Sequence, residues 1–217
     1  MANYKLAEGG CFGGEEWLLA VVVIRHPDTG YPMVTLTIKS FPNDATVVAD
    51  SVDQPGVLAY LTGLFDRLEL SFDVCVGEPG LHGYGVRFEF PVGPKTHQQL
   101  RKLSQYVYDH PEEFHPRGLV DFDRVYELTI RVPQNGRGLM VQPTQYLADE
   151  NINMRHVRAE RNQIDAASGE PEVTITAELE VQGIGCEELE TAIRNVCLQG
   201  SQVEIQPLWP ERYQLPM

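Results

Sequence analysis

The sequence predicts an α+β protein in which one module of strands and helices, with an antiparallel sheet, occurs twice after an N-terminal β-hairpin. Two observations support this prediction. Runs of β-branched residues alternate with segments whose apolar residues recur every three or four positions, the spacing typical of helices. The order of these segments also repeats, and a shift of 82 residues places Gly56 and the segments that follow it on Gly138 and its successors.

Length and composition are those of an ordinary globular protein with room for one large or two small domains. The chain has 217 residues, of which 42% are hydrophobic, so it can build a core. It carries 17 Lys and Arg against 31 Asp and Glu, a net charge of −14, which argues against a nucleic-acid-binding protein. No apolar run approaches the roughly 20 residues of a membrane-spanning helix, and the N-terminus lacks the pattern of a secretory signal. We therefore expect a cytoplasmic protein without nucleic-acid or membrane partners.

Residues 1–43 predict a flexible segment followed by a β-hairpin. The glycine-rich stretch from Gly9 to Gly14 is not expected to hold a fixed conformation by itself. Two β-branched runs, residues 17–26 and 32–39, flank a turn signal that contains Pro27 and Gly30. These runs predict the two strands of the hairpin.

Residues 44–108 predict a first module in the order strand, helix, strand, strand, helix. The expected strands are residues 45–50, 70–76 and 86–90, and the expected helices are residues 57–68 and 97–108. The closing strand of this module has no clear counterpart, and one of the N-terminal strands is a candidate for that edge. Residues 109–123 are acidic and contain Pro111 and Pro116, so they predict a linker.

Residues 124–209 predict a complete second module, followed by a tail at residues 210–217. Its expected strands are residues 125–132, 152–160, 173–181 and 202–208, and its expected helices lie near 144–150 and at 187–198. Pro143 indicates that the first of these helices begins late. The later helices align with a shift of 89 residues, so the second copy has a longer hairpin between its second and third strands. The order βαββαβ predicts a ferredoxin-like arrangement in each module, with both helices on one face of the antiparallel sheet.

The sequence shows no pattern of an enzyme, metal site or cofactor site. The four cysteines have no C-x-x-C spacing, and the six histidines have no metal-binding spacing. We expect Cys75 and Cys197 to be buried and reduced, Cys197 on the inner face of a helix. No general acid-base pair or nucleophile has a recognisable setting, so we predict neither catalytic nor metal-binding residues and no cofactor.

The most specific signal is the turn between the strand at residues 45–50 and the helix at 57–68. It reads Asp53-Gln54-Pro55-Gly56-Val57-Leu58. This turn resembles that of the ACT-domain family, in which D-x-P-G is followed by aliphatic residues. In the second copy Asn135 takes the Asp position and Arg137 the Pro position, while Gly138 and Leu139 match. Residues 151–154 match the start of the family's second strand, where the first copy has Ser71 in place of Asn.

The resemblance implies that small amino acids bind between paired modules at this turn and that a partner protein reads out the binding. The chemistry is suitable, because a glycine lets the backbone approach a ligand at a helix N-terminus, which favours a carboxylate. An Asn offers both a donor and an acceptor to a zwitterion. The candidate ligand-binding residues are Asp53, Gln54, Pro55, Gly56, Val57, Leu58, Ser71, Asn135, Gly136, Gly138, Leu139 and Asn153. We expect Ser71 or Asn153 to join the first turn from an adjacent strand.

The predicted function is that of a non-catalytic regulator, similar to the glycine cleavage system regulatory proteins. It would bind a small amino acid and modulate a protein partner, an enzyme or a regulator, as a homo-oligomer such as a dimer. Three alternatives remain open. A small enzyme on the ferredoxin-like fold would need a polar cluster with a perturbed pKa in a pocket, and none is visible in the sequence. Gly56 and Gly138 could serve only the tight turns, with Asp53 and Asn135 as helix caps. The modules could also mediate protein-protein assembly without any ligand.

Overall fold

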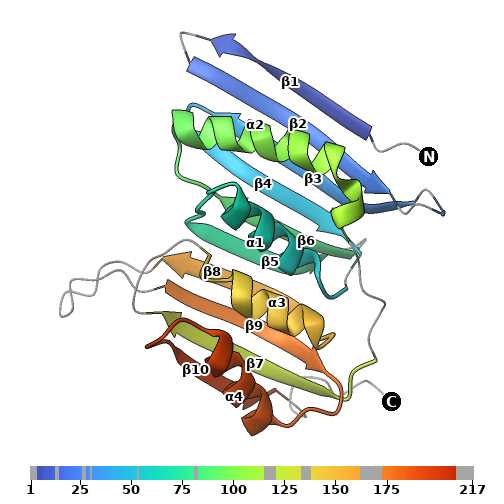
Figure 1. Ribbon diagram of the computed structural model, residues 1–217, viewed down its shortest axis with the longest axis vertical. Helices are drawn as coiled ribbons and strands as arrows, with labels where there is room; N and C mark the ends of the chain where they lie inside the picture. Colours follow the sequence, from blue (N-terminus) through green and yellow to red (C-terminus); the bar gives the residue numbers. More distant parts are fainter. Residues whose placement is uncertain are drawn as a thin grey trace.

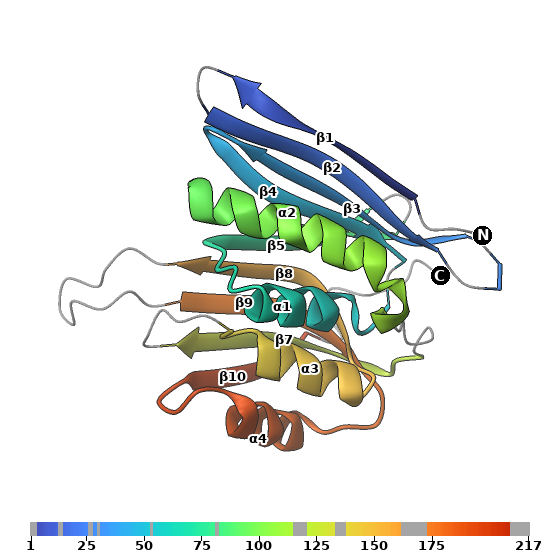
Figure 2. The same ribbon diagram turned by 45° about the horizontal axis from the view of Figure 1, so that its top comes forward.

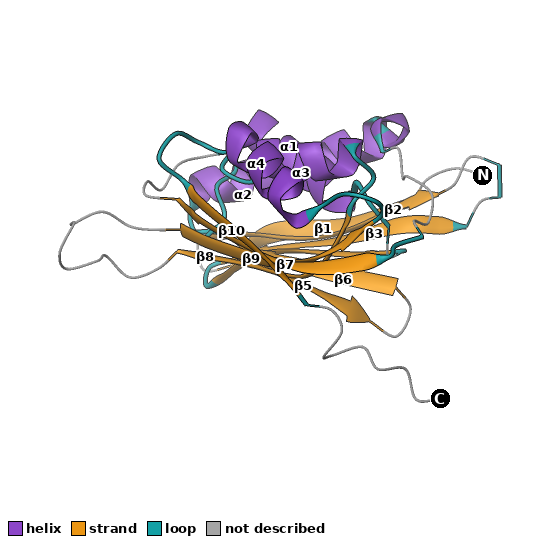
Figure 3. Cartoon of the chain, turned by 90° about the horizontal axis from the view of Figure 1, so that it is seen from below, coloured by secondary structure: helices purple, strands orange, loops and turns teal. Residues whose placement is uncertain are grey.

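A single antiparallel sheet with helices on one face forms the structure. The computed structural model describes residues 4–12, 15–25, 28–29, 31–52, 54–80, 83–114, 121–132, 138–161 and 173–208. Within these ranges, ten strands form one sheet in the order β1-β2-β3-β4-β6-β5-β8-β9-β7-β10. The helices α1 to α4 all lie on the same face of this sheet (Figure 3). This arrangement confirms the predicted α+β class.

The elements have the following bounds. The strands are β1 Tyr4–Phe12, β2 Glu15–Arg25, β3 Pro32–Phe41, β4 Asp44–Ser51, β5 Val74–Gly80, β6 Gly83–Glu89, β7 Arg124–Val132, β8 Asn153–Arg161, β9 Val173–Val181 and β10 Gln202–Pro207. The helices are α1 Val57–Arg67, α2 Pro94–Asp109, α3 Val141–Asp149 and α4 Cys186–Val196, with a 3₁₀ turn at Pro111–Glu113. Among the described residues, every helix falls short of the length and apolarity that a membrane span requires.

The expectation of an irregular glycine-rich segment is wrong for Gly9 to Phe12, which belong to β1. Gly9 pairs with Leu18 and Gly10 with Trp17 along β2. The ladder of backbone hydrogen bonds to β2 offsets the conformational freedom of the glycines. The close packing also needs them, because a Cβ added at Gly9 would lie 2.9 Å from the Trp17 carbonyl oxygen. Gly13 and Gly14 lie outside the described residues.

The strand expected from residue 70 begins later, at Val74. The reason is that Leu70 still completes the end of α1, where its amide donates to the Phe65 carbonyl oxygen at 2.7 Å. Glu69 has a positive φ of 58° at this point, which turns the chain out of the helix. The second copy ends α3 in the same way, with the Ile152 amide 2.8 Å from the Leu147 carbonyl oxygen.

The two halves of the chain complete their sheets with strands of different origin. In the C-terminal half, residues 124–207, the strand order is β8-β9-β7-β10, so the last strand of the half pairs with its first. In the N-terminal half the corresponding order is β5-β6-β4-β3, and the edge position is taken by a strand that precedes β4 in the chain. An N-terminal strand therefore does fill the edge for which the sequence offered no closing strand. Helix α2 extends over β2 and β3 (Figure 2).

The two halves meet edge to edge through β5 and β8. These strands pair antiparallel from Val74 opposite Glu160 to Gly77 opposite Val157, and α1 lies beside α3 (Figure 1). Val76 pairs with Arg158, which lies 82 residues later in the chain. An approximate twofold axis therefore passes through this pair and relates the two halves.

The core lies between the helices and the sheet. Along β3 and β9 alternate residues are buried, as expected for strands with one face covered. In the N-terminal half, Phe65 of α1 packs edge-on against the rings of Phe72, Phe88 and Phe90. This aromatic cluster fixes α1 on the sheet next to the junction between the halves.

Candidate functional site

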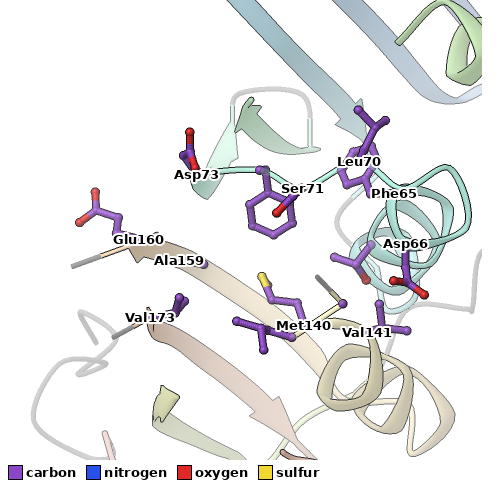
Figure 4. Close-up of a pocket in the computed structure, with 14 residues that line it drawn as sticks. Phe65, Asp66, Leu70, Ser71, Asp73, Met140, Val141, Ala159, Glu160 and Val173 are labelled. Atoms are coloured by element: carbon purple, nitrogen blue, oxygen red, sulfur yellow. The ribbon is translucent and has the colours of Figure 1, made fainter. Parts of the chain in front are cut away.

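Two cavities lie at the junction, one on each side of the approximate twofold axis. Site A, of about 40 Å³, lies between the turn before α3 and the end of α1 (Figure 4). Its lining residues are Thr62, Phe65, Asp66, Leu70, Ser71, Phe72, Asp73, Gly138, Leu139, Met140, Val141, Ala159, Glu160 and Val173. Site B, of about 20 Å³, lies between the turn before α1 and the end of α3. It is lined by Gln54, Pro55, Gly56, Val57, Leu58, Ala59, Tyr84, Thr144, Leu147, Ala148, Ile152, Asn153 and Met154.

The two sites are equivalent under the internal repeat. A shift of 82 residues carries the site B turn, residues 56–59, onto the site A turn, residues 138–141. The same shift carries Ser71 of site A onto Asn153 of site B. Each site thus combines the turn of one half with the helix end and strand start of the other half. Neither site could form within one half.

A pair of hydroxyl groups separates the two sites. The Oγ1 atoms of Thr62 and Thr144, which are 82 residues apart, lie 2.9 Å from each other where α1 meets α3. Thr144 also donates to the carbonyl oxygen of Met140 at 2.7 Å. Because Thr62 lines site A and Thr144 lines site B, a shift of one helix against the other changes both cavities.

The two turns need their glycines. Gly56 has φ 98° and Gly138 has φ 76°, in the left-handed region that other residues rarely adopt. The N-cap positions are held by Gly56 before α1 and Met140 before α3, and neither makes a side-chain capping hydrogen bond. Before α1, the amides of Val57, Leu58 and Ala59 have no intrahelical acceptor and are potential donors to a ligand. Before α3 this supply is smaller, because the Val141 amide donates to the Gly138 carbonyl oxygen at 3.0 Å and Pro143 has no N–H.

Site A is rich in carboxylates. Asp66 lies beside the turn, because a Cβ added at Gly138 would be 3.0 Å from its Oδ1 atom. Asp73 and Glu160 lie together on the opposite side of the cavity (Figure 4). Ser71 is exposed and forms part of the wall between these two regions. Site A therefore offers anionic acceptors on two sides of the cavity, which suit the ammonium group of a zwitterion.

Site B has a different polar side chain, which is already bonded within the protein. Asn153 is buried, and its Nδ2 atom donates to Oε2 of Glu180 at 2.9 Å. The other carboxylate oxygen of Glu180 accepts from Nη1 of Arg155 at 2.8 Å. Hence at least one donor of Asn153 is used inside the sheet.

The structure divides the sequence-predicted residues between the two sites. Gln54, Pro55, Gly56, Val57, Leu58 and Asn153 line site B, whereas Ser71, Gly138 and Leu139 line site A. Of the two candidates for the strand residue beside the first turn, Asn153 is therefore the one that the fold places there. Asp53, Asn135 and Gly136 lie outside the described residues.

Sequence reasoning missed the residues that each site takes from the other half. Asp66 of site A and Thr144 of site B are examples. It also missed Ala159, Val173 and Tyr84, which lie in the same half as the turn of their site. These residues do not belong to any recognisable sequence motif. The signal that could have found them is the repeat itself, once the two copies are docked through their second strands.

None of the cysteines whose side chains the structure describes lines either site. Cys75 is fully buried, and burial raises the pKa of its thiol well above the ordinary value. Cys197 lies just after the end of α4 rather than on the helix, partly buried, and burial raises its pKa to about 11. Within the described residues, His, Cys, Asp and Glu form no group of three or more that could hold a metal ion.

Comparisons with known proteins show a likeness of structure and none of sequence. No protein-family model and no curated protein matches the chain. The crystal structure of aspartate kinase from Synechocystis is similar over 83% of this chain, with a TM-score of 0.51 and 14% identity. The chain spans 31% of that kinase.

A second structure, provisionally described as a glycine cleavage system transcriptional repressor, matches 75% of this chain and 95% of its own length at 15% identity. Its TM-score of 0.33 is too low to support an argument about the fold. The likeness to aspartate kinase agrees with the resemblance that the turn at Asp53 to Leu58 carries. At the level of the fold, the chain is an ACT-domain-like protein.

Proposed function

We propose that the chain is a non-catalytic regulatory protein that binds a small amino acid between two tandem ACT-like modules. The modules are residues 44–108 and 124–209, joined by residues 109–123, with β3 completing the first module. The observation that carries this proposal is the pair of equivalent cavities, each built from the glycine turn of one half and the helix end of the other.

The geometry gives a means of regulation. A ligand in either site contacts both halves, so it favours the arrangement of α1 and α3 to which it binds more tightly. The Thr62–Thr144 contact lies between the sites and would move with that arrangement. A cytoplasmic enzyme or regulator that contacts the helical face would then distinguish the bound from the free form.

A thermal-shift scan against the twenty amino acids tests the proposal. A ligand at a hundred times its dissociation constant stabilises the native state by about 2.7 kcal/mol. For a chain of this size, that corresponds to a rise in Tm of roughly 5–11 °C. We expect one or a few amino acids to give such a rise, and no such rise from any of the twenty would contradict the proposal.

One substitution and one control variant test whether the rise in Tm comes from binding at site A. Ser71→Phe places a ring at the exposed wall of site A and should abolish a shift that arises there. Gly63→Ala is the matched control on α1, because a Cβ at that position meets nothing within 4 Å. A shift that survives Ser71→Phe would place the ligand outside site A.

A ligand-independent assembly module is the second candidate. It is favoured by the ends of the sheet, since β1 and β10 each pair with one strand among the described residues. The nine residues of β1 present a longer unpaired edge than the six of β10, which ends at Pro207. Sedimentation velocity distinguishes this candidate, because edge pairing would give a concentration-dependent mass without any amino acid present.

A further inference from the structure

We infer that Tyr84 closes site B, so that the chain binds one amino acid, at site A, despite having two equivalent sites. This inference rests on the proposed function. It concerns what we call the floor residues of each half, one residue of the second strand and its neighbour on the third. Both floor residues line site A, whereas only the third-strand residue, Tyr84, lines site B.

The floor residues are equivalent by the register of the sheet. In the N-terminal half Gly77 of β5 lies opposite Val86, and Tyr84 is two residues before Val86. In the C-terminal half Ala159 of β8 lies opposite Ile175, and Val173 is two residues before it. Gly77 and Tyr84 are therefore the counterparts of Ala159 and Val173.

In site B, the side chain of Tyr84 lies over Gly77, which has no side chain. A Cβ added at Gly77 would lie 2.1 Å from the Tyr84 hydroxyl oxygen and 2.8 Å from Cζ. The phenol group thus occupies the space that a side chain at Gly77 would need. Tyr84 is only 5% exposed, so it belongs to the packed interior and does not project into solvent.

The pair in site A leaves this space free. The side chains of Ala159 and Val173 together have four heavy atoms, against eight in a tyrosine side chain, and both residues are buried at the floor of the cavity. Accordingly, site A encloses about 40 Å³ and site B about 20 Å³. A water molecule needs at least about 10–15 Å³ on this scale, so site B has room for about one.

The other residues that line the two cavities also favour binding at site A. Site A has Met140 where site B has Leu58, and an unbranched thioether side chain rearranges more readily than a leucine to admit a ligand. At the strand start, site A has the exposed Ser71, whereas Asn153 of site B is bonded to Glu180. Site A can widen with small side-chain movements, while site B would have to expel a buried aromatic ring.

Exchanging the two floors tests the inference. The variant Gly77→Ala/Tyr84→Val gives site B the floor of site A, and Ala159→Gly/Val173→Tyr gives site A the floor of site B. Tyr84→Phe keeps the ring, so it is the matched control. Isothermal titration calorimetry uses the amino acid that gives the largest thermal shift with the unaltered chain, and circular dichroism checks that each variant is folded.

We expect a stoichiometry of one for the unaltered chain and for Tyr84→Phe, and of two for the variant with the opened site B. The variant with the closed site A should bind at least ten times more weakly. Amide shifts of Gly138 in ¹⁵N NMR spectra should respond to binding in the unaltered chain, and those of Gly56 only when site B is open.

Other outcomes separate the two proposals. Two molecules bound to the unaltered chain would keep the proposed function and overturn the role of Tyr84. If the folded variant Gly77→Ala/Tyr84→Val still binds only one amino-acid molecule, the role of Tyr84 is overturned as well. Absence of binding to every folded variant, for all twenty amino acids, would overturn the proposed function itself.

Discussion

The N-terminal and C-terminal halves share one arrangement of strands and helices but fill it with different side chains. The aromatic cluster of the N-terminal half consists of Phe65, Phe72, Phe88 and Phe90. The repeat places Leu147, Met154, Ala177 and Leu179 at the equivalent positions of the C-terminal half. The comparison shows that the backbone arrangement depends on the pattern of buried positions, while the volume at each position can differ between the copies.

The largest expected losses of stability come from truncating the helix residue of each core. Phe65→Ala should destabilise the protein by about 4 kcal/mol and Leu147→Ala by about 3 kcal/mol, because a phenyl ring leaves the larger cavity. Both residues are almost fully buried, at 1% and 0% exposure. Urea unfolding of the two variants measures the difference, and a greater loss for Leu147→Ala would show that the aromatic cluster does not stabilise its half more strongly.

The next difference concerns the strands that complete each sheet. Ile38 of β3 lies between two neighbouring strands under α2, whereas Ile205 lies on the edge strand β10. Ile38→Ala should therefore cost about 4 kcal/mol and Ile205→Ala about 2 kcal/mol, since an edge strand can relax around the lost volume. Equal losses in thermal unfolding would mean that β10 is held as rigidly as β3.

A smaller effect is expected from the ionic network that only the C-terminal half has. Glu180 is buried and binds both Asn153 and Arg155, and these three residues correspond to Pro91, Ser71 and Asp73 in the other half. Glu180→Ala should destabilise the protein by about 2 kcal/mol, because it leaves the two donors without their acceptor. Glu180→Gln, which keeps an acceptor oxygen, should lose less in urea unfolding, and an equal loss would exclude the hydrogen bonds as the cause.

The smallest effect concerns the chain after α2. The hydrogen bond from the Tyr106 hydroxyl to Glu113, at 2.6 Å, and the one from Arg67 hold the pKa of the Glu113 carboxyl below its ordinary value. A lowered pKa stabilises the native state above the pKa of the unfolded chain, and this stabilisation is lost as the pH falls through the native pKa. Glu113→Gln should cost less than about 1 kcal/mol at pH 7, because the pair is partly exposed. At a pH below the native pKa of the Glu113 carboxyl, the two proteins should be equally stable. A difference in urea unfolding that persists in acid would point to packing instead of charge.

The sequence predicted most of the secondary structure because its local signals agreed with the tertiary fold. The strand at residues 173–181 was predicted with its observed bounds, and α1 was predicted within one residue at its end. The failures occurred where a partner decides the structure. Gly9 and Gly10 form a strand because β2 lies beside them, which no local pattern of that segment indicates. The late start of β5 depends on a hydrogen bond from Leu70 to α1.

The candidate sites were predictable only in part for the same reason. The glycine turns have a local signature, so Gly56 and Gly138 were found from the sequence. Their opposite walls come from the other half, and the pairing of β5 with β8 that brings them together has no sequence motif. Thr144 is an example, since it lies 88 residues after Gly56 in the chain but lines the same cavity.

The pairing of β5 with β8 also has a kinetic consequence, because both strands belong to one polypeptide. Between separate chains such a junction would form and dissolve with dilution. A covalent connection of moderate length keeps the two edges at an effective concentration of the order of millimolar or higher. Any opening of this junction is therefore unimolecular, and its rate and extent do not depend on how much of the protein a cell contains. Because both halves belong to one chain, a mutation can change site A without changing site B. In a dimer of identical chains, every mutation would change both equivalent sites.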